Sequence, residues 1–143
     1  MINVVVDTNL YVSALINRNS RDRLGYILRD NRFNILIDRT LITELYQVIH
    51  RPKFAKYVTH EQIESFFALL NDRGSFINTT SSVIYSPDPK DDFLLALCLD
   101  GNAEYLITGN KIDLLDLQHY GRTTILSLSE FLITFFGNHP TIP

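Results

Sequence analysis

The sequence predicts an α/β protein in which a parallel sheet is covered by helices on both faces. Short apolar segments of strand length alternate along the chain with longer segments of helical periodicity. Residues 2–6 are a β-branched run that stops at Asp7, a pattern typical of a buried parallel strand. Polar residues follow several of these strands, at the edge where open parallel sheets bind their ligands.

Length and composition indicate one domain over residues 1–143. The chain is 45% hydrophobic and 20% charged, ordinary values for a globular protein. No apolar stretch approaches the roughly 20 residues that span a bilayer, and no secretory signal is recognisable, so we expect a cytoplasmic protein. Cys98 is the single cysteine, which excludes an intramolecular disulfide and a thiolate metal cluster, and the four histidines lack metal-site spacing.

In the first part of the chain, strands are expected at residues 2–6 and 33–37, and helices at residues 8–16, 20–31 and 39–50. Ser20 is expected to cap the second helix, because a serine side chain accepts hydrogen bonds from the first turn. Pro52 follows the third helix and ends it.

In the second part, strands are expected at residues 75–79, 105–108 and 123–126, helices at 60–72, 91–100 and 129–136, and a helical turn at 112–117. The segment SPDPK is a turn-rich loop. Ser127 or Ser129 caps the last helix. The regular alternation of strands and helices favours a parallel sheet.

Charge is unevenly distributed, although the net charge is only −3. Residues 1–60 carry nine Lys and Arg against five acids, and residues 61–143 carry four against eleven. A basic strip that follows a phosphate backbone and a solvated helix face are both consistent with this pattern. The strip consists of Arg18, Arg21, Arg23, Arg29 and Arg32.

Asp7 is the first candidate metal ligand. It follows three valines at the end of a buried strand, where a carboxylate either caps the next helix or binds a ligand. Asn9, two residues later, adds a neutral oxygen. Carboxylate and amide oxygens together suit a hard cation.

Three further acids are candidates from the predicted helices. Glu44 borders the apolar face of its helix, although an exposed edge position is the alternative interpretation. Asp92, with Asp91 beside it, begins an otherwise apolar helix, and either residue could cap it. Because capping uses only one of the two, a second carboxylate is left for the site.

The tripeptide Thr108, Gly109 and Asn110 ends another strand, and Lys111 and Asp113 follow it. It is either a fourth contribution to the same sheet edge or an ordinary turn. Acids gathered at one edge repel each other and need a cation to offset the repulsion. Mg²⁺ or Mn²⁺ held there supports phosphodiester displacement without a side-chain nucleophile.

Three segments carry a resemblance to a known family: VVVDTNLYVSAL, ITELYQVIHRPKF and DPKDDFLLALCLDGNAEYLITGNKIDLL. The sequence resembles the PIN-domain family, particularly the bacterial VapC-like toxins. The resemblance implies a three-layer α/β/α sandwich with a largely parallel five-stranded sheet. It also implies Mg²⁺ or Mn²⁺ dependence, cleavage of single-stranded RNA, a small antitoxin protein as partner and, in many members, a homodimer.

The resemblance also implies roles for particular residues. The family's three acids fall on Asp7, Glu44 and Asp92, and Asn9 is the supporting amide. Where the family reads TGD this chain reads TGN, so Asn110 replaces a fourth acid, and Asp113 is positioned to compensate.

The leading hypothesis is a metal-dependent endoribonuclease with Asp7, Glu44 and Asp92 as catalytic ligands. The expected further metal ligands and supporting residues are Asn110, Asp113, Asn9, Asp91 and Thr108. The alternative is a catalytically impaired PIN scaffold that binds RNA or a protein without cutting, motivated by the missing fourth acid. A phosphate-handling enzyme of receiver or haloacid-dehalogenase type is disfavoured, because the dehalogenase form needs an acid at position 9.

Overall fold

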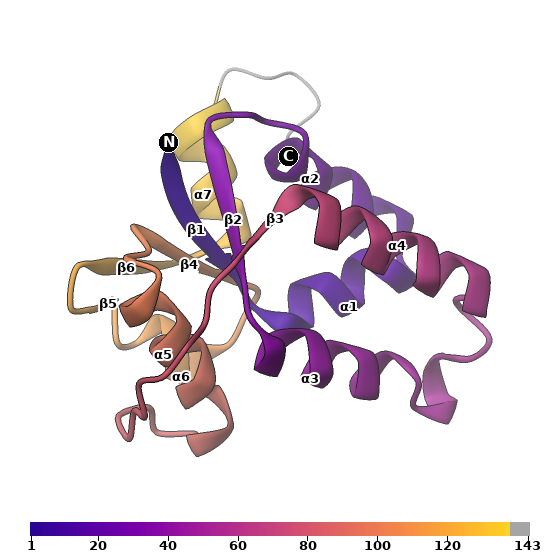
Figure 1. The fold of residues 1–143 in the computed structure, drawn as a ribbon. Helices are drawn as coiled ribbons and strands as arrows, with labels where there is room; N and C mark the ends of the chain where they lie inside the picture. The colour runs from indigo at the N-terminus through magenta and orange to yellow at the C-terminus, as the bar shows by residue number, and fades with distance from the viewer. Residues whose placement is uncertain (138–143) are drawn as a thin grey trace.

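The computed structural model describes residues 1–137, and its centre is a six-stranded sheet in the order β3-β2-β1-β4-β6-β5 (Figure 1). The strands are β1 (Ile2–Val6), β2 (Phe33–Ile37), β3 (Gly74–Phe76), β4 (Tyr105–Thr108), β5 (His119–Tyr120) and β6 (Thr123–Ser127). All neighbouring pairs are parallel except β5 and β6. The predicted largely parallel sheet is therefore confirmed, with six strands where five were predicted, because two-residue β5 is too short to produce an alternating pattern.

The helices agree with the predicted ones, with ends shifted by up to three residues. They are α1 (Thr8–Ile16), α2 (Arg18–Leu28), α3 (Arg39–Ile49), α4 (His60–Arg73), α5 (Asp92–Asp100), α6 (Ile112–Leu115) and α7 (Leu128–Phe136). Two short 3₁₀ turns, η1 (Pro52–Phe54) and η2 (Pro89–Asp91), lie between them. No helix in the described part of the chain is both long and apolar enough to cross a bilayer.

The caps show where helix starts were predicted well and where they were not. The Ser127 hydroxyl accepts a hydrogen bond from the Glu130 N–H at 3.1 Å, so Ser127 and not Ser129 caps α7. The prediction that Ser20 caps α2 is wrong. Its N–H instead donates to the side chain of Asn17 at 3.0 Å, and α2 begins two residues earlier.

Helices cover both faces of the sheet. On one face, Phe33 of β2 packs against Phe131 of α7, with 5.1 Å between ring centroids, and Tyr105 of β4 contacts the same ring. On the other face, the turn after α5 lies so close that a Cβ atom at Gly101 would come within 2.6 Å of the Leu36 side chain. These contacts give the predicted three layers.

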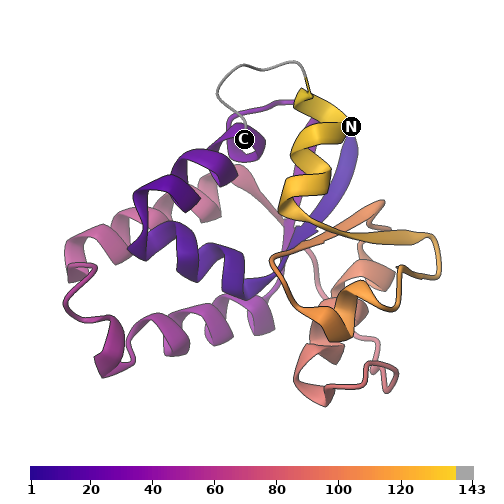
Figure 2. The ribbon, with the colours of Figure 1, turned by 180° about the vertical axis from the view of Figure 1, so that it is seen from behind.

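Figures 1 and 2 show α1 to α4 grouped on one side of the molecule and α5 and α6 on the other. Strands β1 and β2 run in the same direction and are followed directly by α1 and α3. The carboxyl ends of the central strands therefore meet between these two groups of helices, where the predicted polar residues lie.

Candidate metal centre

Asp7 links β1 to α1 and is almost completely buried, with 3% of its surface exposed. One carboxylate oxygen accepts a hydrogen bond from the Asn9 N–H at 3.2 Å, and the other accepts one from the Thr108 hydroxyl at 2.8 Å. Burial raises the pKa of Asp7, and these two hydrogen bonds oppose the rise. Asp7 thus caps α1 and still presents a poorly solvated carboxylate to its surroundings.

Asp91, at the end of η2, is also buried, with 5% exposed. Its Oδ1 atom lies 3.2 Å from Nζ of Lys111, whereas Oδ2 is buried and has no hydrogen-bond partner in the described part of the chain. Burial raises the pKa of Asp91, the ammonium of Lys111 opposes the rise, and the charge of Asp7 adds to it. A buried carboxylate oxygen without a donor is costly, and this one is available to a ligand.

Asp7 and Asp91 line one cleft of about 180 Å³. Glu44, half-buried on α3, lines it from the side of α1 to α4, as does Asn9. Three basic residues, Arg51, Lys90 and Lys111, line it as well. The cleft is thus built by four separate regions of the chain: the end of β1, α3, η2 and the segment after β4.

Asp92 lies outside this cleft. Its Oδ1 atom accepts hydrogen bonds from the N–H groups of Ser86 at 2.7 Å and Tyr85 at 3.3 Å, and its side chain lines a different hollow with Asp38. Successive residues point about 100° apart around a helix, so only one of two adjacent acids faces the cleft. The structure brings Asp91, expected only as a supporting residue, to the place where Asp92 was expected.

The residues at the end of β4 and after it also differ in whether they reach the cleft. Thr108 binds Asp7 as described, and Lys111 reaches the cleft, where it also lies 3.3 Å from Asp88. Asn110 is exposed and lines a neighbouring polar cavity, and Asp113 is exposed at the start of α6. Lys111 was not predicted as a site residue, and its position directly after TGN was the only signal for it in the sequence.

A family model described as the PIN domain matches residues 3–112, which include every residue named in the cleft. The chain belongs to the PIN domain family. The resemblance inferred from the three sequence segments is confirmed by this match.

A solved structure with a similar fold is the crystal structure of VapBC2 from Rickettsia felis bound to a DNA fragment from their promoter. The two chains are 18% identical, and the alignment covers 88% of this chain and 98% of the other, with a TM-score of 0.56. The comparison with curated proteins found no significant match. At this identity the likeness supports the fold assignment alone.

The cleft of this PIN domain offers oxygen donors only, from Asp7, Glu44 and Asp91. As the side chains lie, no three His, Cys, Asp or Glu residues of residues 1–137 surround a single point closely enough to hold an ion. The ammonium of Lys111 supplies opposite charge instead, and Arg51 and Lys90 line the same cleft. The unpartnered Oδ2 of Asp91 and the carboxylate donors fit a hard divalent cation such as Mg²⁺ or Mn²⁺.

Proposed function

We propose that this PIN domain is a metal-dependent endoribonuclease that cleaves phosphodiester bonds of single-stranded RNA. The observation that carries the proposal is the pair of buried carboxylates, Asp7 and Asp91, in one cleft, where Oδ2 of Asp91 has no partner. Two buried like charges are stable together only when a cation offsets their repulsion. Family membership supports nuclease chemistry at this site.

Asp7, Glu44 and Asp91 are the proposed ligands for Mg²⁺ or Mn²⁺. A bound cation would supply the charge that activates water and stabilises the leaving oxygen. The Thr108 hydroxyl and the Asn9 N–H hold the Asp7 carboxylate in one orientation. Asp92 holds the backbone that leads into η2 through its hydrogen bonds to residues 85 and 86, so we assign it a supporting role.

Lys111 has a proposed role beside these acids. In the structure its ammonium pairs with Asp91 and Asp88. A cation in the cleft would compete with that pairing, and the released ammonium would favour the approach of a negatively charged phosphodiester. Lys111 thus keeps the acids together when no metal is bound.

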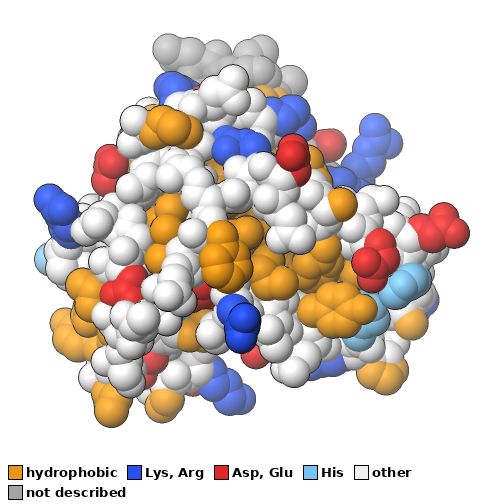
Figure 3. Space-filling view, in the orientation of Figure 1, with side chains coloured by type: hydrophobic (Ala, Val, Ile, Leu, Met, Phe, Trp, Pro, Cys, Tyr) orange, Lys and Arg blue, Asp and Glu red, His pale blue; other side chains and the backbone are white. Residues whose placement is uncertain are grey.

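We further propose that the protein acts in the cytoplasm as the toxin of a toxin-antitoxin pair, with a small antitoxin protein as partner and a homodimer as its own assembly. The similar solved structure is of VapBC2, which supports a protein partner. Hydrophobic side chains gather across the middle of the face in Figure 3, and the exposed large apolar residues include Tyr46, Phe76 and Ile84. Exposed apolar surface of this kind is typical of protein interfaces.

The test is an incubation of the purified protein, freed of any copurifying partner, with a panel of single-stranded RNAs and Mn²⁺ or Mg²⁺. We expect cleavage that EDTA abolishes and that Asp7→Asn lowers by at least about 100-fold, the effect of about 2.7 kcal/mol in the barrier. Asp72→Asn is the matched control, because Asp72 is an exposed acid on α4 outside the cleft. Equal losses in both variants would contradict the assignment of the cleft.

The second candidate is an impaired scaffold that binds RNA or a protein without cutting. It is favoured by Asn110 in place of an acid, and by the absence of a preformed three-residue ligand cluster in residues 1–137. RNA binding without cleavage, combined with no metal binding by calorimetry, would select this candidate over the nuclease.

A further inference from the structure

A second cavity of about 440 Å³ adjoins the acidic cleft, and Asn9 lines both. Its lining is mostly polar, with hydroxyl, amide and guanidinium groups from Ser13, Ser20, Arg23, Asn110 and Ser129. In contrast to the acidic cleft, no Asp or Glu is among its lining residues in the part of the chain that the structure describes. The cavity therefore suits a ligand that is negatively charged.

Arg23 is the only charged residue among those that line this cavity. Its Nη2 atom donates a hydrogen bond to the Ser129 hydroxyl at 2.7 Å. Its Nε atom is buried and has no hydrogen-bond partner within residues 1–137, and none of their carboxylates forms an ion pair with it. A guanidinium carries five donors and no acceptor, so Arg23 has further Nη N–H groups with which to donate to an acceptor in the cavity.

The other arginines of the predicted basic strip have different surroundings. Arg21 donates to the backbone carbonyl of Ala14 at 3.4 Å, Arg29 lies over the ring of Tyr26, and Arg32 pairs with a carboxylate. Arg23 alone among them lines the cavity beside the cleft.

Glu130 contacts one lining residue of this cavity, because its Oε1 atom accepts a hydrogen bond from the Ser127 hydroxyl at 3.1 Å. That hydroxyl and the Glu130 carboxylate occupy each other in the cap of α7. We therefore assign no ligand to Ser127, and the candidate ligand contacts are Arg23, Ser129 and the side-chain amides of Asn9 and Asn110.

We propose that this cavity binds a phosphate group of the RNA strand next to the phosphodiester that is cleaved, with Arg23 as its main contact. The inference rests on the proposed function, because it assumes that the RNA crosses the acidic cleft beside this cavity. The planar guanidinium matches two phosphate oxygens, and the Asn9 and Asn110 amides and the Ser129 hydroxyl provide further donors. The volume is within the roughly 300–1,000 Å³ of small-ligand sites, so the cavity admits a phosphate with part of its nucleotide.

The test measures binding apart from cleavage. A fluorescently labelled short single-stranded RNA is titrated with protein in EDTA over a range of NaCl concentrations. Each phosphate contact with a single strand contributes about 0.7 to the slope of log K against log salt. We expect Arg23→Gln to lower this slope by about 0.7 and to weaken binding roughly tenfold at low salt, whereas Arg23→Lys retains most of the slope.

Arg18→Gln is the matched control, because Arg18 is exposed on the same helix and the substitution removes the same charge. Circular dichroism melting establishes that each variant is folded. Equal effects of Arg18→Gln and Arg23→Gln, or no change in the slope for Arg23→Gln, would overturn the inference. If RNA binding depends on Arg23 but no RNA is cut with Mn²⁺, the phosphate site is supported and the proposed nuclease function fails.

Discussion

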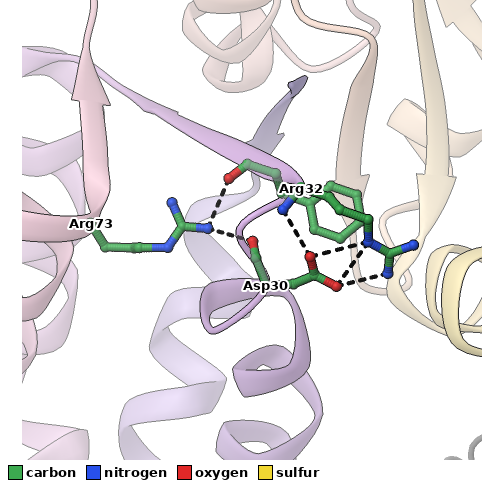
Figure 4. Close-up of polar contacts among 4 residues, drawn as sticks. Asp30, Arg32 and Arg73 are labelled. Carbon is green, nitrogen blue, oxygen red and sulfur yellow. Dashed lines mark hydrogen bonds and ion pairs between the residues drawn. The ribbon is translucent and has the colours of Figure 1, made fainter.

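Two regions of the molecule hold charged side chains where the chain turns, and they differ in how completely each charge is partnered. In the first, which we call the arginine corner, Arg73 donates to the backbone carbonyls of Leu28, Asp30 and Phe33 at 2.7 to 2.8 Å. Arg32 binds both carboxylate oxygens of Asp30, and Figure 4 shows the two arginines on either side of this turn. The corner joins the end of α2, the start of β2 and the end of α4.

In the acidic cleft, by contrast, Lys111 forms an ion pair with Asp91, whereas Arg51 and Lys90 line the cleft without an ion pair to either buried carboxylate in residues 1–137. Burial raises the pKa of Asp7 and Asp91, whereas the hydrogen bond from Arg32 lowers the pKa of Asp30. Fully partnered charges hold the corner together, and incompletely partnered charges in the cleft cost stability and remain available to a ligand. This difference, and not the number of charges, distinguishes the candidate site.

The largest expected effect distinguishes two adjacent acids, Asp91 inside the acidic cleft and Asp92 outside it. We expect Asp91→Asn to lower metal-dependent RNA cleavage by roughly 100-fold or more and to weaken Mn²⁺ binding in calorimetry. Asp92→Asn should change the rate less than about threefold, because an amide oxygen still accepts from the Ser86 N–H. If Asp92→Asn has the larger effect, Asp92 and not Asp91 is the third ligand.

For the arginine corner we expect a loss of stability without a loss of cleavage. Arg73→Met should lower the free energy of unfolding by about 2–4 kcal/mol in urea titrations, because three carbonyls lose a charged donor. Arg73→Lys keeps the charge but not the planar guanidinium, so it should lower the free energy of unfolding by less. Cleavage by the folded Arg73→Met variant should match the wild type, and a specific loss of cleavage would show that the corner contributes to the site.

The two regions also differ in how much of each could be predicted from the sequence. The ends of β1 and β4 were predicted to the residue, because each apolar run stops at a polar residue, and this placed Asp7 and Thr108 at the ends of neighbouring strands. The choice between Asp91 and Asp92 depends on where a helix begins, which patterns locate only within one or two residues.

Contacts between distant segments could not be predicted from the sequence. Arg23 has the same local pattern as the other arginines of its helix, and it is distinguished only by Ser129, 106 residues away in the chain. Arg73 likewise ends an ordinary helix and meets its acceptors 40 to 45 residues earlier. Side-chain partners at such separations follow from packing and not from local periodicity.

A pH titration of stability in EDTA tests the difference between the carboxylates of the cleft and the carboxylate of the arginine corner. The folded-state pKa values of Asp7 and Asp91 lie above the unfolded value of 3.8, so the stability they contribute is present below about pH 4 and is lost as the pH rises. The pKa of Asp30 is lowered, so its contribution is present at neutral pH and is lost as the pH falls. Asp91→Asn should therefore raise the melting temperature at pH 7, and Asp30→Asn should lower it.

The Asp91→Asn difference should disappear near pH 3, where that carboxyl group is protonated in the folded and unfolded states, whereas the Asp30→Asn difference should disappear only below the lowered pKa of Asp30. Differential scanning calorimetry over this pH range is the measurement. The same sign of effect for Asp91→Asn and Asp30→Asn at pH 7 would contradict the distinction between a partnered corner and an unpartnered cleft.

A small effect is also expected of Asn110→Asp, which restores the acid of the family's TGD motif. Asn110 is exposed and lines the polar cavity, not the acidic cleft, so a carboxylate there should change the cleavage rate less than about fivefold. In that cavity it should weaken RNA binding at low salt, because it repels the phosphate assigned to Arg23. A gain in cleavage of more than about tenfold would instead favour the impaired scaffold, and it would mean that the metal centre extends into the second cavity.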